Sequence, residues 1–315
     1  MDISCALAAL FFLTANVVRI VFFSLERRRN HWDWNEYIKL LPDYIENEWA
    51  FRRETQGLWF ASGVLNALAW LIFAYPVIQM AWLLSDGGRK AIMFNIGIVL
   101  LAFSGAFMEW ISSLFWIGMN VASKNLVENF NLDNWVRSDL ADADNGVGWT
   151  ALEINHIAGS GFIWFGDSFE WLCLSGIFIF TFCSVRIWRR DDQTSFGERW
   201  NGLSMLIGLL CLLEFILEIV RFEGFYSVGP SALVLSAINR LIFMPVWILS
   251  LGFMMPRAYL KQRYTDTDPI AAELALAESQ AADGKFAIDD TDDVPSPPSP
   301  ASPPPEAFAR TLVTP

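Results

Sequence analysis

The chain has 315 residues, of which 54% are hydrophobic and 15% aromatic, and only 18% are charged. A soluble domain of this length cannot bury so much apolar surface, so the composition excludes an ordinary globular protein and predicts a membrane protein. The net charge of −12 comes mainly from residues 264–315, where ten acidic residues against two basic ones give −8 and leave −4 for residues 1–263. The body has no large basic patch, which argues against a nucleic-acid partner.

The first predicted membrane segment covers residues 3–24. It lacks the basic start of a signal peptide and is as long as a full crossing, so it is interpreted as a retained helix. Three consecutive arginines at 27–29 follow it and predict that this end faces the cytoplasm.

Residues 31–56 are polar and rich in tryptophan, with apolar residues at helical spacing. They predict an amphipathic segment lying in the membrane interface, with a solvated loop as the alternative.

Six further membrane segments are predicted along the chain, and a stretch of 40 residues contains two of them. They cover residues 58–84, 91–119, 149–166, 169–188, 203–222 and 231–255. As one helix, residues 149–188 would be about 60 Å long, twice the thickness of a hydrocarbon core. The first half is semi-polar and the second half is apolar, so we predict two crossings here. The alternative is six crossings in total, if residues 149–166 do not cross.

The distribution of arginine and lysine favours seven crossings. Six crossings divide the basic residues of the loops equally, nine on each side, whereas seven place fifteen inside and three outside. Cytoplasmic loops normally carry the excess of these residues. The predicted fold is therefore an all-α integral membrane helical bundle with seven segments, the N-terminus outside and the C-terminus in the cytoplasm. Epitope tags at residues 145 and 195 should then both be cytoplasmic.

Ionisable residues inside the predicted segments form the candidate intramembrane polar site. A charge at membrane depth is costly, and it usually faces a bundle interior or a water-filled cavity. The eight candidates are Arg19, Glu109, Glu153, His156, Glu170, Glu214, Glu218 and Arg240.

Two pairs of these residues lie at matching depths. Arg19 and Glu109 each lie a few residues beyond the middle of two segments that run in the same direction. Glu214 and Arg240 lie a few residues to the same side of the centres of two antiparallel segments. We therefore predict the ion pairs Arg19–Glu109 and Glu214–Arg240.

The remaining carboxylates are predicted to have a partner on their own helix or access to water. Glu218 can pair with Arg221 three residues further along its own helix. Glu170 and Asp167 lie near the end of a predicted segment, where water is available. Two interpretations follow: the charges are structural salt bridges that fix the helix arrangement, or they line a polar cavity or a permeation path.

Motifs for catalysis and for cofactors are missing from the sequence. His31 and His156 are the only histidines, which leaves no histidine-rich metal or haem site. There is no G-x-S-x-G element and no phosphate-binding loop. The four cysteines all lie in apolar runs and are interpreted as small buried hydrophobes. We therefore predict a protein that is not an enzyme and has no cofactor or metal site.

The predicted tail, residues 264–315, is acidic and then rich in proline, a composition typical of disorder. Ser296, Ser299 and Ser302 each precede a proline, which makes them candidates for a proline-directed kinase. Residues 295–298 have the form of a ligand for an SH3-like groove. Such a tail favours a eukaryotic plasma membrane or endomembrane.

These features predict a multi-pass protein of the lipid bilayer with a charged intramembrane seam. The leading hypothesis for its function is a small-solute or ion transporter or channel. The alternative is a non-catalytic membrane scaffold, or a receptor-like seven-helix protein, in which the buried charges are structural salt bridges.

Overall fold

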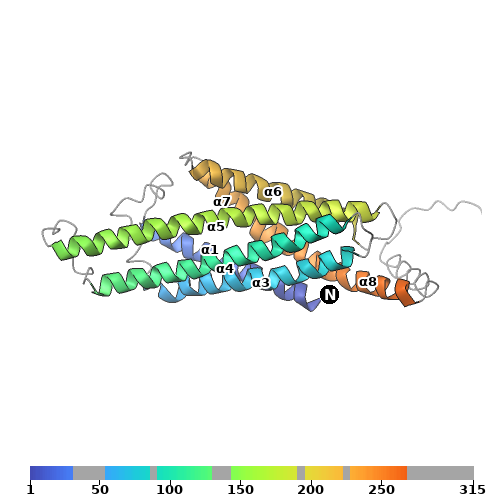
Figure 1. The fold of residues 1–315 in the computed structure, drawn as a ribbon, viewed down its shortest axis with the longest axis horizontal. Coiled ribbons are helices and arrows are strands. Elements are labelled where there is room, and N and C mark those ends of the chain that lie inside the picture. Colours follow the sequence, from blue (N-terminus) through green and yellow to red (C-terminus); the bar gives the residue numbers. More distant parts are fainter. Residues whose placement is uncertain (31–53, 86–90, 130–142, 190–195, 223–227, 268–315) are drawn as a thin grey trace, which may run out of the picture. The chain divides into compact units, whose positions relative to one another are not determined.

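The computed structural model describes residues 1–30, 54–85, 91–129, 143–189, 196–222 and 228–267, and nearly all of them are helical (Figure 1). The predicted all-α membrane bundle is confirmed. Residues 1–267 form one compact unit. The predicted tail from residue 268 onward, and the predicted interfacial segment except its last three residues, lie outside the described residues.

Six stretches of the described chain are long and apolar enough to cross a membrane, which makes this a multi-pass membrane protein. Five of them are single helices, and the sixth is a continuous run in which a π-helix separates two α-helices. The elements are α1 (Ile3–Asn30), α3 (Gln56–Ser85), α4 (Ile92–Asn129), α5 (Ala143–Arg189), α6 (Glu198–Phe222), α7 (Gly229–Ile238), η4 (Asn239–Phe243) and α8 (Met244–Thr267).

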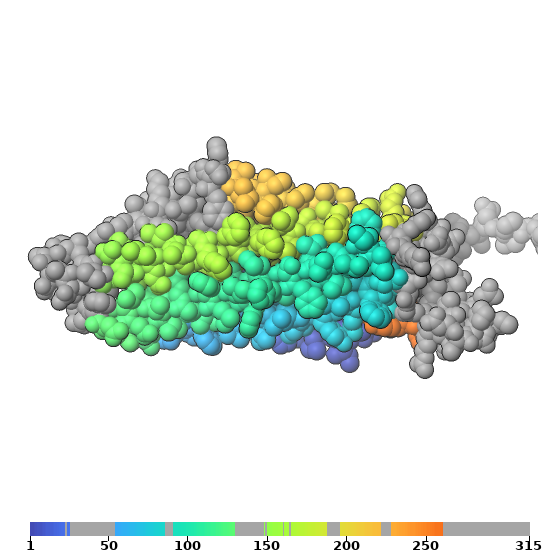
Figure 2. All heavy atoms as spheres, in the orientation of Figure 1, coloured from blue at the N-terminus to red at the C-terminus, as the bar shows by residue number. Residues whose placement is uncertain are grey.

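The spanning helices follow one another around a closed ring. Contacts join α1 to α3, α3 to α4, α4 to α5 and α5 to α6, and the α7–η4–α8 run contacts both α6 and α1. Figure 2 shows α4 and α5 side by side along one face of the bundle. Large apolar side chains point outward, among them Leu71, Phe103 and Phe253, which are at least half exposed. An apolar exterior of this kind suits a surface that faces lipid.

The region between residues 143 and 189 differs from the prediction. It forms one continuous helix, α5, of 47 residues. At 1.5 Å per residue it is about 70 Å long, so it passes through a hydrocarbon core of about 30 Å and extends beyond it. The predicted segments 149–166 and 169–188 are therefore parts of one crossing, and the count of seven is wrong. The six-crossing alternative agrees with the structure.

Two glycines in the middle of this region have a packing role and do not interrupt the helix. A Cβ atom on Gly159 would overlap Met119 of α4, and one on Gly166 would overlap Ser112. Both contacts belong to one antiparallel seam in which the contacting residues recur every seven positions on α4 and α5. Small residues allow the backbones of membrane helices to approach closely. The glycines thus maintain a long α4–α5 pair.

Direct contacts show how the first and last helices are oriented relative to one another. The backbone N–H of Asp2 donates to the carbonyl oxygen of Gly252 at 2.7 Å. Further along α1, Asn16 contacts Arg240, which precedes Gly252 in the chain. The α1 helix and the α7–η4–α8 run are therefore antiparallel, and the start of α1 lies at the same end as the final part of α8. The predicted topology, with the N-terminus outside and the last segment ending in the cytoplasm, does not fit this arrangement, because the start of α1 and the end of α8 lie at one end of the bundle.

Epitope tags provide a direct test of this topology. We expect tags at residues 145 and 195 to be on opposite sides of the membrane, because α5 crosses once between them. A tag at the N-terminus should share the side of residue 195. Protease protection or antibody accessibility in sealed cells measures each position, and detergent permeabilisation controls for epitope exposure. Tags at 145 and 195 on the same side would contradict a single crossing by α5.

Candidate functional site

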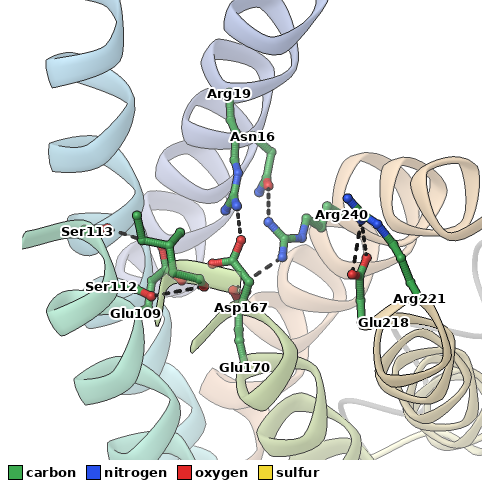
Figure 3. A network of polar contacts seen from close by, with 11 residues as sticks. Asn16, Arg19, Glu109, Ser112, Ser113, Asp167, Glu170, Glu218, Arg221 and Arg240 are labelled. Carbon is green, nitrogen blue, oxygen red and sulfur yellow. Dashed lines mark hydrogen bonds and ion pairs between the residues drawn. The ribbon is translucent and has the colours of Figure 1, made fainter. Parts of the chain in front are cut away.

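A group of charged side chains meets in the interior of the bundle (Figure 3). Arg19 of α1 forms an ion pair with Asp167 of α5. Arg240 of η4 forms an ion pair with Glu170, one turn further along α5, with 3.3 Å between Nη2 and Oε2. Arg240 also donates a hydrogen bond from Nη1 to Oδ1 of Asn16 at 3.4 Å. Helices at opposite ends of the chain therefore meet at one level of α5.

A third carboxylate, that of Glu109 on α4, completes the group. Ligand oxygens of Glu109, Asp167 and Glu170 all lie within 4.8 Å of one another. The Glu109 side chain is only 2% exposed. Its Oε1 accepts a hydrogen bond from Ser113 at 3.3 Å, whereas its Oε2 is buried without a hydrogen-bond partner. We call these three residues the acidic triad.

Helical spacing explains how each element presents its residues. Asp167 and Glu170 are three residues apart, so they lie on the same face of α5. Asn16 and Arg19 share a face of α1 for the same reason. Glu109 and Ser113 are four residues apart on α4, which allows the hydroxyl to reach the carboxylate within one helix.

The π-helix η4 positions the second arginine of the group. Pro245 follows it, and a proline cannot donate the backbone hydrogen bond that an α-helix requires. The N–H of Met244 instead donates to the carbonyl oxygen of Asn239, five residues earlier. This wider turn buries both Asn239 and Arg240. The guanidinium of Arg240 also lies 4.5 Å from the ring centroid of Trp171, a distance suited to a cation–π contact.

The charges of the group do not cancel. The acidic triad contributes three formal negative charges, and Arg19 and Arg240 contribute two positive ones, so the sum is −1. We call these five residues the charged cluster. Exposure varies across it: the side chains of Arg19 and Asp167 are 18% and 21% exposed, but those of Glu170 and Glu109 only 2%. The cluster therefore extends from a partly accessible ion pair to fully buried carboxylates.

Two of the predicted ion pairs are wrong. Arg19 pairs with Asp167 and not with Glu109, and Arg240 pairs with Glu170 and not with Glu214. Matching depth located the correct layer of the bundle for Arg19 and Glu109. It did not identify the partners, because α5 presents its own carboxylates to both arginines.

The α5 carboxylates themselves were misplaced by the prediction. Because α5 is continuous, Asp167 lies at its middle and not near a segment end. Glu170 is buried with its ion pair and is not in a water-accessible position. Asp167 was also missing from the predicted site. The available signal was the spacing of these two acids by three residues within a long apolar stretch.

The other predicted site residues lie outside the charged cluster. Glu218 pairs with Arg221 at 3.2 Å, which confirms that predicted pair. Glu214 is 1% exposed on α6, and its Oε2 has no hydrogen-bond partner. His156 is also buried on α5, but it precedes Asp167 by eleven residues, about 16 Å along the helix. Glu153 lies one turn further from the cluster.

Comparisons with models of protein families, with curated proteins and with solved structures found no match to this chain. The functional argument therefore depends on the geometry of the charged cluster.

Proposed function

We propose that this membrane protein is a transporter or channel for a small solute or an ion, and that the charged cluster is its intramembrane site. The observation that carries the proposal is the excess of carboxylates in the bundle interior. Three of them meet two arginines, and their ligand oxygens lie within 4.8 Å of one another. Ionisable residues at membrane depth commonly mark the paths of ions and substrates.

The imbalance of charge separates this arrangement from a set of structural salt bridges. A buried charge is costly unless a partner compensates it. Asp167 and Glu170 each have an arginine, but Glu109 forms no ion pair within the described residues. The two ion pairs that connect α1 and η4 to α5 do not require this third buried carboxylate. A transport site uses such a group to bind its substrate.

Two further features support transport. The partial exposure of the Arg19–Asp167 pair gives the cluster contact with its surroundings, next to the buried Glu170 and Glu109. In addition, Arg240 lies on a π-turn, and π-turns inside α-helices are frequent at functional sites.

A second candidate function is a scaffold in which the charges only hold helices together. The two direct ion pairs favour it, because they connect α1 and η4 to α5. This second function predicts no flux above that of empty liposomes, in the wild type or in any variant.

Flux measurements in proteoliposomes distinguish the two functions. We expect the purified protein to transport an ion or a small solute down an imposed gradient. Glu109→Gln should reduce the rate at least tenfold, because the amide retains the shape of the side chain but removes its charge. The matched control is Glu128→Gln, on the same helix, whose side chain is 60% exposed. Rates no higher than those of empty liposomes, in the wild type and both variants, would favour the scaffold, and equal rates above that level would remove Glu109 from the transport site.

A further inference from the structure

We infer that the acidic triad binds one monovalent metal cation. This inference deepens the proposed function by naming the class of ligand at the same site. Cation binding does not itself require transport, so the two can be tested separately.

The spacing of the triad suits coordination of a single ion. One oxygen from each of Glu109, Asp167 and Glu170 lies within 4.8 Å of the other two. Sides of at most this length put the centre of the triangle no more than about 2.8 Å from each corner, a range that includes the 2.3–2.6 Å typical of oxygen ligands on a cation of calcium size. The site draws on two helices, since α4 supplies one ligand and α5 supplies two.

A second observation points to a missing ligand. The Oε2 atom of Glu109 is buried without a hydrogen-bond partner, on a side chain that is 2% exposed. The Ser113 hydroxyl occupies the other oxygen, Oε1. An ionised carboxylate oxygen at this depth loses its hydration, and either a bound cation or a proton must compensate for that loss. A cation among the three carboxylates would satisfy this atom.

The surrounding charges favour an ion with one positive charge. Arg19 on α1 and Arg240 on η4 face the triad and leave it with a sum of −1. The facing helix α3 contains no charged residue. On α6, Glu218 is neutralised by Arg221, and Glu214 lies outside the group of oxygens that approach within 4.8 Å.

A divalent ion fits this arrangement less well. Calcium and magnesium bind six or more oxygen ligands, usually with carboxylates that are free to neutralise them. Two of the three carboxylates here already share their charge with an arginine. One monovalent cation brings the formal charge of these five residues from −1 to zero, whereas a divalent cation brings it to +1.

Glu109 is the residue that tests the site without dismantling it. Replacement by glutamine leaves both ion pairs intact and brings the formal charge of the charged cluster to zero. The variant is therefore expected to fold as well as the wild type. Its loss of cation binding can then be separated from a loss of structure.

Thermal unfolding of the full chain in detergent measures the effect of cations. The probe is NaCl, compared with KCl and with N-methylglucamine chloride at the same ionic strength. We expect Na⁺ or K⁺ to raise the melting temperature of the wild type by roughly 5 °C at a hundredfold excess over Kd. Glu109→Gln should show no such rise, whereas the surface control Glu128→Gln should retain it.

Three outcomes would overturn the inference: an equal melting temperature of the wild type in all three chlorides, a response to calcium or magnesium alone, or an unchanged response in Glu109→Gln. Flux in proteoliposomes separates this inference from the proposed function. Cation binding without any flux would retain the site and reject transport. Flux that depends on Glu109 without cation binding would reject the site and retain transport.

Discussion

Replacement of Arg240 by leucine is expected to destabilise the folded protein by about 3–5 kcal/mol, the usual cost of leaving one member of a buried ion pair without its partner. Glu170 would remain 2% exposed without a cation. The formal charge of the charged cluster would change from −1 to −2. The variant would also lose the hydrogen bond to Asn16 and the contact with the Trp171 ring. Unfolding in a denaturing detergent, followed by tryptophan fluorescence, measures the loss.

The double variant Arg240→Leu with Glu170→Leu should be milder than Arg240→Leu alone. It removes both members of the ion pair and returns the formal charge of the charged cluster to −1. A double-mutant cycle gives the coupling energy of the two side chains. Lys124→Leu is the control, because its ion pair with Glu128 is largely exposed and such pairs contribute about 0–1 kcal/mol. Single and double variants with equal losses would refute the pairing of Arg240 with Glu170.

Gly166→Val is the second substitution with a large expected effect. A Cβ atom at this position would overlap the Ser112 hydroxyl and lie 3.3 Å from the Ser112 Cβ, so the hydroxyl must rotate and the methyl groups of valine then press α5 away from α4 beside the acidic triad. We expect a loss of about 1–3 kcal/mol, which is typical of overpacking in a tightly packed interior. A wider gap between the helices would also separate Glu109 from the α5 carboxylates.

Gly161→Val on the same helix is the matched control for this substitution. A Cβ atom on Gly161 has no atom within 4 Å, and valine has a higher helix propensity than glycine. The control should therefore be as stable as the wild type or slightly more stable. Melting temperatures in detergent compare the two variants. Similar losses in both would mean that helix propensity, and not close packing against α4, decides the effect.

The all-α membrane class could be predicted from composition because it depends on the amount of apolar surface alone. The apolar stretches also gave the approximate positions of the crossings. Only their number is wrong, at residues 149–188, where a length greater than one bilayer thickness predicts two crossings. A helix can extend beyond the membrane when a neighbour covers it, and α4 supplies that cover for α5 along a seam that includes Gly159 and Gly166.

The candidate site was predicted only in part. Residue type and apolar context identified Arg19, Glu109 and Arg240 as deep charges and Glu170 as a candidate near a segment end, and all four belong to the charged cluster. Asp167 was omitted because it appeared to lie at a segment boundary. The two long-range pairs were wrong because depth along a helix is one coordinate, whereas a side-chain contact also depends on helix rotation and on which helices are neighbours.

The sequence by itself determined that the chain is a helical membrane protein with costly charges in its interior, because both properties follow from residue type and spacing. The i,i+3 pair Glu218–Arg221 also followed from local spacing. Only the tertiary structure decided that α5 crosses once and that three carboxylates from α4 and α5 meet two arginines from α1 and η4. These contacts join residues as far apart as 16 and 240, and only the packing of the helices brings such residues together.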